Sequence, residues 1–312
     1  MAIFLNILFL ILGMVLLIKG ADFFVSGASA VAKRFKIPSL FIGLTIVALG
    51  TSLPELSVSL AGAIKKNVDM SVGNIVGSNF MNLFLIFGIS ALIRPTQIKK
   101  TSKKLDFPFL IGITFLLLLF SVDTYINGAN TNIITRTESI ILIIVFLIYM
   151  MLSIFIAKKE HQLMFDAPPP ENAENQKKAE KDLKIWQIVL FIILGLGAVV
   201  FGAECVSTTA QFLAKKIGMS DTLVGLTIVA IGTSLPELAT SVIASVKGET
   251  ELAVGNLIGS SIFNIALILG SVGLITPINV SSTILIDTLI LFVFTTIFSV
   301  LCMAKKIISK WM

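Results

Sequence analysis

Apolar residues run along this chain in long stretches that short polar segments separate. A transmembrane helix needs about 20 consecutive apolar residues. Nine stretches come close to or exceed that length: 3–30, 39–63, 71–93, 106–122, 135–157, 185–212, 221–246, 253–275 and 281–303. Apolar residues make up 56% of the chain and charged residues only 13%, against about a quarter charged in soluble domains. The pattern predicts an all-α polytopic membrane protein with nine spans.

The chain contains two copies of one unit. Residues 43–62 read GLTIVALGTSLPELSVSLAG and residues 225–244 read GLTIVAIGTSLPELATSVIA, identical at 14 of 20 positions with an offset of 182. The offset holds without a gap from Gly20 and Gly202 to Pro95 and Pro277. Residues 1–157 are therefore expected to form a first transmembrane repeat, 158–184 a linker loop, and 185–312 a second repeat.

The two repeats are expected to have opposite orientations in the membrane. Five spans, an odd number, precede the polar segment 158–184, so the second copy enters from the other face. Inverted repeats of this kind are typical of secondary transporters, whose substrate site lies near the midplane. The second copy has only four of the five predicted spans.

Positive charge is distributed unevenly between the two sides. With the N-terminus outside, the inner loops hold 18 of the 24 Lys and Arg residues and the outer loops five. Because basic loops stay in the cytoplasm, we expect a multi-pass protein of the cell membrane with a cytoplasmic central loop. The net charge of +6 comes without the basic, aromatic-rich face that nucleic-acid binding needs. Asp22, three residues from Lys19, is expected to form a local ion pair.

Each copy carries one acid inside an apolar run, Glu55 in the first and Glu237 in the second. A carboxylate at membrane depth is costly and by default marks an ion or proton pathway. Pro54 and Pro236 precede these acids. Proline cannot donate to the carbonyl four residues earlier, so we expect a kink and loosened carbonyls beside each acid.

Polar side chains follow the helical spacing on four segments. Ala48, Ser52, Glu55 and Ser59 share one face because residues three and four apart are neighbours. The second copy repeats this stripe, and two further stripes follow it. These are Ala230, Ser234, Glu237 and Ser241; Asn74, Ser78 and Asn82; and Asn256, Ser260 and Asn264. Carboxylates, amides, hydroxyls and free carbonyls are the oxygen ligands that a hard cation such as Ca²⁺ takes.

A structural explanation exists for each feature separately, since prolines kink membrane helices and serines join them. Their joint recurrence at one offset favours a cation site. A channel could use the same acids, but a pseudo-twofold chain with one internal site suits alternating access better. An intramembrane serine hydrolase is disfavoured, because the only histidine, His161, falls in the predicted loop and no lysine base lies near Ser52 or Ser234. We expect no enzyme.

The motif GTSLPE in both halves, each followed by GN(I/L)(V/I)GSxx(M/F)N, resembles the alpha-repeats of the calcium/cation antiporter superfamily. It is most similar to the prokaryotic sodium/calcium exchangers. The resemblance covers nearly all of residues 1–303. It implies ten helices, of which the four motif helices form an ion-binding core and the first and sixth slide to switch access. It also implies a functional monomer in a lipid bilayer with no cofactor, and Ca²⁺ and Na⁺ as transported substrates.

By the same resemblance, Glu55 and Glu237 bridge Ca²⁺, with the Thr51 and Thr233 carbonyls as further ligands. The implied Na⁺ ligands are the carbonyls of Ala48 and Ala230 together with Thr51, Ser52, Ser260, Thr233, Ser234 and Ser78. The implied amides of the central site are Asn82 and Asn264.

One departure from relatives concerns Asn264, since several of them, including potassium-dependent exchangers, have Asp there. An amide removes a charge and favours K⁺-independent exchange. Calcium/proton members show a different motif, of the GNAPE type, which makes Ca²⁺/H⁺ antiport the alternative.

Overall fold

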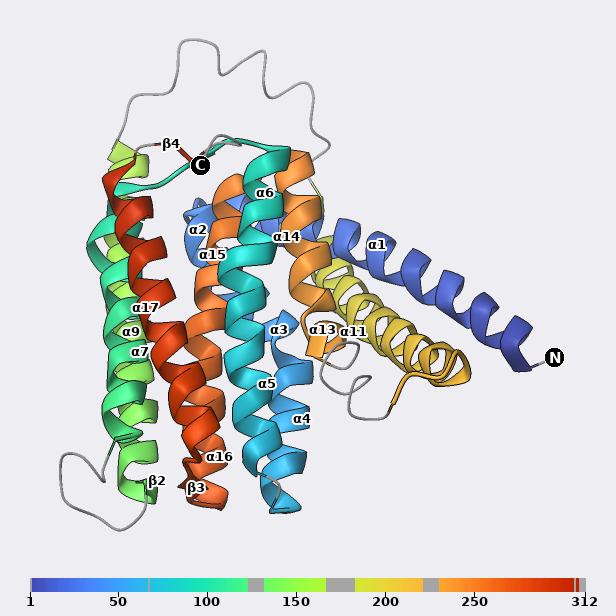
Figure 1. Ribbon diagram of the computed structural model, residues 1–312. Helices are drawn as coiled ribbons and strands as arrows, with labels where there is room; N and C mark the ends of the chain where they lie inside the picture. The colour runs from blue at the N-terminus through green and yellow to red at the C-terminus, as the bar shows by residue number, and fades with distance from the viewer. Residues whose placement is uncertain are drawn as a thin grey trace.

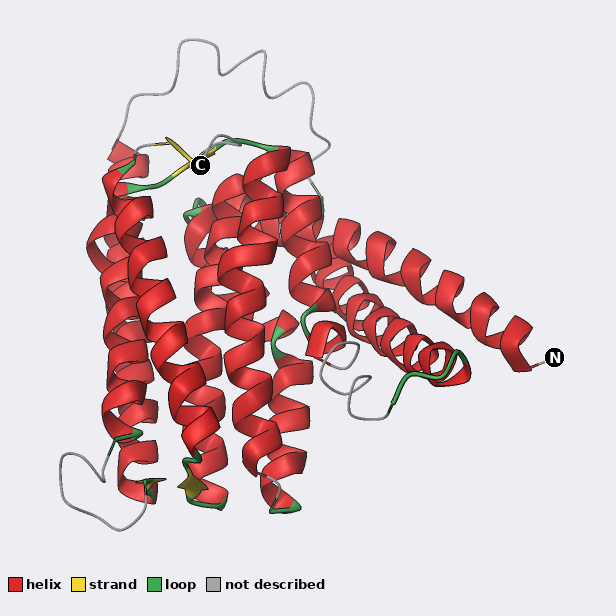
Figure 2. Ribbon diagram, in the orientation of Figure 1, coloured by secondary structure: helices red, strands yellow, loops and turns green. Residues whose placement is uncertain are grey.

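The computed structural model describes residues 2–66, 68–122, 132–166, 183–220, 230–305 and 307–308. These residues fold almost entirely into helices, with four two-residue strands at the ends of the bundle (Figure 2). In the first half of the chain, the helical elements and strands are α1 (Ala2–Phe35), α2 (Ser39–Ile42), η1 (Gly43–Val47), α3 (Ala48–Thr51), α4 (Leu53–Ile64), α5 (Val68–Phe80), η2 (Met81–Ile86), α6 (Phe87–Ile93), β1 (Thr96–Gln97), η3 (Ser102–Asp106), α7 (Phe107–Phe120), β2 (Ile133–Ile134) and α9 (Arg136–Asp166).

The second half of the chain follows the same order as far as it is described. Its elements are α11 (Ile185–Lys216), α13 (Ala230–Thr233), α14 (Leu235–Lys247), α15 (Thr250–Ile262), η5 (Phe263–Leu269), α16 (Gly270–Ile275), β3 (Ile278–Asn279), α17 (Ser282–Ala304) and β4 (Ile307–Ile308). The elements named η are π-helical turns, in which backbone hydrogen bonds join residues five apart instead of four. The bundle is all-helical, in agreement with the expectation from the apolar stretches.

Six described helices are long and apolar enough to cross a membrane, and the bent pair Ser39–Thr51 and Leu53–Ile64 makes up to seven. Of the other predicted spans, 106–122 corresponds to α7, which has 14 residues and follows η3 directly. Residues 221–229 of the predicted span 221–246 lie outside the described residues, as do 167–182 of the expected linker. The count of nine spans stays a prediction. Helix α9 continues to Asp166, so His161 lies on a helix rather than in a loop.

The backbone repeats at the offset seen in the sequence. All four described residues with positive φ form two repeat-related pairs: Lys36 (52°) with Gly218 (93°), and Lys66 (59°) with Gly248 (83°). The π-helical turns η2 and η5 both begin at repeat-related residues, Met81 and Phe263. Turns that nothing in the apolar pattern requires are therefore duplicated along with the motifs.

Helices α1 and α11 form a separate layer, oblique to the upright bundle and beside it (Figure 1). They cross closely because glycines line the contact. A Cβ on Gly202 would lie 2.6 Å from the Leu17 backbone nitrogen, and a Cβ on Gly20 would lie 2.7 Å from the Val199 nitrogen. These two contacts are related by the repeat offset. Small residues at such crossings are how membrane helices approach, since lipid provides no hydrophobic drive.

The strands tie the bundle ends together. Strand β1 pairs antiparallel with β4, and β2 with β3. The two strand pairs lie at opposite ends of the bundle (Figure 1). The C-terminal residues Ile307 and Ile308 are therefore held against the segment that follows α6.

Valine at Gly202 is expected to force α1 and α11 apart and to lower the free energy of unfolding by about 1–3 kcal/mol, the usual effect of overpacking. The matched control is Gly197→Val on the same helix, because a Cβ there meets nothing within 4 Å. Thermal unfolding of both variants in detergent tests this. Equal stability of the two variants would contradict the close crossing.

Candidate functional site

The site begins at two helix breaks. Helix α3 ends at Thr51 and α4 starts at Leu53 with a bend of 47°. The residue at the break, Ser52, has φ −85° and ψ 7°, and its repeat equivalent Ser234 has φ −87° and ψ 3°. Each break is followed by a proline in the first turn of the new helix, where its missing N–H is harmless. The kink predicted at Pro54 is confirmed, and the helix also breaks before Pro236.

Each break places an acid in the first turn of the new helix, Glu55 in α4 and Glu237 in α14. Both are 1% exposed. The unsatisfied N–H groups at a helix N-terminus carry partial positive charge and stabilise a carboxylate there. The helix breaks therefore provide two buried carboxylates with a favourable backbone field that an unbroken helix would not supply.

Hydroxyl groups surround the two carboxylates and cross between the copies. Ser52 Oγ donates to Glu237 Oε1 at 3.0 Å, and Ser260 Oγ donates to the same oxygen at 3.3 Å. Ser78 Oγ donates to Glu55 Oε1 at 3.4 Å. Because Ser52 belongs to the first copy and Glu237 to the second, the site exists only where the two copies meet.

The two halves of the site are not identical. By the repeat offset, Ser234 should bond to Glu55 as Ser52 does to Glu237. Instead Ser234 Oγ donates to Ser78 Oγ at 3.3 Å. Ser78 then links Ser234 to Glu55, so that the hydroxyl of one half reaches its acid directly and that of the other half indirectly.

Two threonines at the breaks are held by asparagines of the opposite copy. Thr51 Oγ1 donates to Asn256 Oδ1 at 3.1 Å, and Thr233 Oγ1 donates to Asn74 Oδ1 at 3.2 Å. The asparagines in turn donate to serines within their own copies: Asn256 to Ser241 at 2.9 Å and Asn74 to Ser59 at 3.3 Å. The two asparagines and these two serines lie on the polar stripes but are not among the predicted ligands. Their recurrence at the offset of 182 is the signal in the sequence that marks them as part of the site.

Several buried polar atoms of the site have no hydrogen-bond partner among the described residues. They are Glu55 Oε2, Glu237 Oε2, and the amide oxygen and nitrogen of both Asn82 and Asn264. Leaving a buried polar group unpaired costs about 1–3 kcal/mol, and more for a charged one. Carboxylate and amide oxygens are the donors that a hard cation takes, so the donor set fits Ca²⁺ or Na⁺ as cargo.

Both unpartnered amides lie on π-helical turns, Asn82 on η2 and Asn264 on η5. Such turns are often found at functional sites. Two glycines, Gly73 and Gly77, precede Asn82 in the sequence, but glycine indicates only a loosened helix and does not specify a π-helical turn.

The structure brings most of the predicted ligands together. Ser52, Ser78, Ser234 and Ser260 connect to the two acids through the hydrogen bonds above, and the Ala48 carbonyl oxygen lies 3.5 Å from Ser260 Oγ. Thr51 Oγ1 lies 3.5 Å from the same Ser260 Oγ, and Thr233 is held by Asn74. Ala230 begins α13 at the position equivalent to Ala48. Which of these atoms bind an ion stays a prediction.

Long apolar helices around a paired buried acid site define a membrane protein that handles cations. The model of the family "Sodium/calcium exchanger protein" matches residues 5–155 and 187–311. The chain belongs to this family. Its relatives are transporters rather than enzymes.

Comparisons with individual proteins support the same family. The chain is 40% identical to CaxA of Alkalimonas amylolytica over 272 residues, covering 86% of this chain and 81% of the relative. It is 32% identical to the sodium/calcium exchanger MaX1 of Methanosarcina acetivorans, covering 91% and 87% respectively. A solved structure of the sodium-calcium exchanger NCX_Mj, soaked with 10 mM Na⁺ and 10 mM Sr²⁺, matches with a TM-score of 0.82 at 26% identity, over 99% of this chain and 94% of the other.

Glu55→Gln and Glu237→Gln are each expected to weaken equilibrium Ca²⁺ binding by more than about 100-fold, because one remaining carboxylate leaves the buried divalent cation with a net positive charge. Asp287→Asn is the matched control, since this acid is exposed on α17. Binding measured by calorimetry on detergent-solubilised protein tests this. Near-normal affinity in either glutamine variant would contradict the assignment.

Proposed function

We propose that this chain is a secondary antiporter that exchanges Na⁺ for Ca²⁺ across the cell membrane by alternating access. The observation that carries the proposal is the group of buried, unpartnered oxygens on Glu55, Glu237, Asn82 and Asn264. Membership of the sodium/calcium exchanger family and the likeness to exchangers named for these two ions support it.

In this proposal, Glu55 and Glu237 bridge one Ca²⁺, with the carbonyls of Thr51 and Thr233 and the amides of Asn82 and Asn264 completing its oxygen ligands. Na⁺ ions take sites on either side of the centre. The proposed Na⁺ ligands are Ala48, Thr51, Ser52 and Ser260 on one side, and Ala230, Thr233, Ser234 and Ser78 on the other. Two carboxylates balance one divalent cation, and without a cation their charges repel in a medium of low dielectric.

That repulsion gives a reason for exchange. A core without a bound cation holds two uncompensated carboxylates next to each other, so switching sides in that state is unfavourable. A core loaded with Ca²⁺ or with Na⁺ is neutralised and can switch. Na⁺ at the flanking sites also depends on the charge of Glu55 and Glu237, the two acids that bind Ca²⁺. Each ion must therefore weaken the binding of the other by the same factor.

The proposed arrangement is two inverted repeats, 1–157 and 185–312, with the N-terminus outside and the linker 158–184 in the cytoplasm. One chain contains a whole site, since Ser52 of the first copy contacts Glu237 of the second. We therefore propose that the monomer is the functional unit.

Na⁺-driven Ca²⁺ uptake into proteoliposomes is expected to proceed without K⁺ on the Ca²⁺ side, because Asn264 supplies no charge for a further monovalent ion. Separate Na⁺, K⁺ and H⁺ gradients, imposed one at a time, are the measurement. A requirement for K⁺ would refute this charge argument. Uptake driven by H⁺ but not by Na⁺ would favour the Ca²⁺/H⁺ alternative.

Rising Na⁺ is expected to displace Ca²⁺ at equilibrium, since both need the two glutamates. If more than two Na⁺ replace one Ca²⁺, each cycle moves net charge and responds to voltage, at about 2.3 kcal/mol per charge per 100 mV. Ca²⁺ binding against rising Na⁺, followed by flux at a clamped potential, tests both points. A Ca²⁺ affinity that ignores Na⁺ would rule out a shared site, and voltage-insensitive flux would rule out the electrogenic stoichiometry alone.

A further inference from the structure

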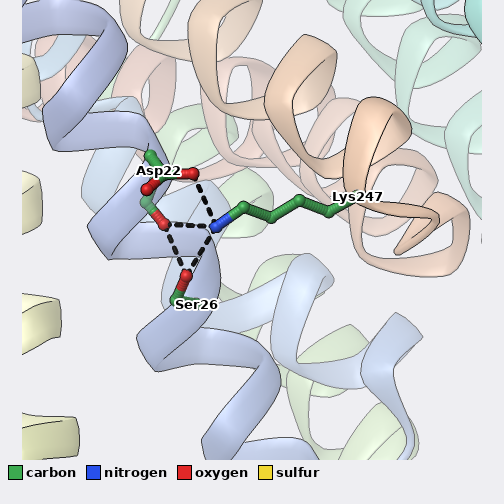
Figure 3. A network of polar contacts seen from close by, with 3 residues as sticks. All are labelled: Asp22, Ser26 and Lys247. Carbon is green, nitrogen blue, oxygen red and sulfur yellow. Dashed lines mark hydrogen bonds and ion pairs between the residues drawn. The ribbon is translucent and has the colours of Figure 1, made fainter.

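A polar contact joins α1 to the end of α14. Lys247 Nζ lies 2.7 Å from Asp22 Oδ1 and donates to Ser26 Oγ at 2.6 Å and to the Asp22 carbonyl oxygen at 2.8 Å (Figure 3). The local pair of Asp22 with Lys19 expected from the sequence is therefore wrong: the partner lies 225 residues away. A sequence shows only neighbours along the helix, whereas the partner is set by how α1 crosses the bundle.

A second contact lies one to two turns further along α1. Ser29 Oγ donates to Glu249 Oε1, and Lys33 Nζ lies 3.7 Å from the same oxygen. Both contacts reach the turn between α14 and α15, where Gly248 has a φ of 83°. Helix α1 is thus held at successive turns to one end of α14.

The first contact has a counterpart at the repeat offset of 182. Asp22 corresponds to Glu204, Ser26 to Thr208 and Lys247 to Lys65, so an acid, a hydroxyl and a lysine recur in the same order. Lys65 lies at the C-terminal end of α4, as Lys247 does at that of α14. The side-chain chemistry of the contact is therefore present twice.

Only one of the two sets is joined. Thr208 Oγ1 donates to Glu204 Oε1 at 3.2 Å, and no ion pair between Glu204 and Lys65 is found, although both residues are described and exposed. Helix α1 packs against α14, whereas α11 makes no comparable contact with α4. Figure 1 shows the free end of α4 well apart from α11.

We propose that the two groups of residues are alternative latches, that is, contacts that form one at a time and determine to which side of the membrane the site is open. Asp22, Ser26 and Lys247 hold α1 on α14 in this state. Glu204, Thr208 and Lys65 hold α11 on α4 in the opposite state, in which the first set is broken. The inference rests on the proposed alternating access, because it assigns the two sets to its two end states.

The latches explain how a helix layer can move without a strong preference for either position. Breaking the Asp22–Lys247 pair is offset by forming the Glu204–Lys65 pair, which reduces the difference in free energy between the two states. Exposed ion pairs contribute little individually, which suits contacts that must break in every cycle. Neither set contains a residue of the ion site, so the latches act on the balance between states and supply no ligand to the ion.

The test uses the full chain, with Cys205→Ala and Cys302→Ala removing the native thiols. Lys65→Cys with Glu204→Cys reports the latch that is open here, through the rate of cross-linking by a short bifunctional thiol reagent; a reagent is needed because residues joined by long side chains lie too far apart for a direct disulfide. Asp22→Cys with Lys247→Cys reports the latch that is closed here. Thermal unfolding and size-exclusion profiles confirm that each variant is folded.

Adding Lys247→Gln to the Lys65–Glu204 reporter breaks the closed latch. It is expected to raise the cross-linking rate about two- to fivefold, which corresponds to the loss of one exposed ion pair. Lys100→Gln, an exposed lysine outside both sets, is the control and should leave the rate unchanged. An unchanged rate with Lys247→Gln, or a reporter that never cross-links while the thiol-free parent transports Ca²⁺, overturns the proposal.

Ion conditions separate the latches from the proposed function. When the Na⁺ and Ca²⁺ concentrations are varied, the cross-linking rates of the two reporters should change in opposite directions. If both rise together, the latches do not alternate. If the reporters alternate with pH but ignore Na⁺, the latches stand and Na⁺ coupling fails.

Discussion

Two carboxylates share one apolar interior, and the rest of the structure accommodates them. Charges of like sign repel strongly where the dielectric is low, and nothing in a bilayer hydrates them. Glu55 and Glu237 are 1% exposed and receive hydroxyl hydrogen bonds from both copies of the repeat. Each also sits at the N-terminal end of a helix. The broken helices and the polar stripes follow from the need to stabilise charge that the membrane does not.

The buried polar atoms of the site that lack a hydrogen-bond partner are as informative as the hydrogen bonds themselves. The donors reach one oxygen of each acid, and the other oxygen and both central amides have no partner in the described part of the chain. A fully satisfied polar network would be a rigid structural element. A network with buried oxygen atoms left unpaired is instead suited to gain free energy from a cation.

Much of this site could be predicted from the sequence, because helical spacing fixes which residues share a face. The stripe through Ser52 and Glu55 and the kink at Pro54 depend on local geometry, and the structure has both. The pairing of Thr51 with Asn256, or of Asp22 with Lys247, depends on how helices cross. No local pattern carries that information. The π-helical turns were also beyond prediction, since glycines near a turn indicate looseness without specifying its geometry.

The π-helical turn at Asn82 has a consequence for how this chain can evolve. Each residue added to or removed from a helix rotates everything beyond it by about 100° relative to what came before. A single deletion between Ser78 and Asn82 would therefore rotate Asn82 away from the helix face on which Ser78 contacts Glu55. We therefore expect a change in length here to be more harmful than a substitution on the lipid-facing side. The two copies agree with this expectation, because they align without a gap from Gly20 to Pro95 even where their residues differ.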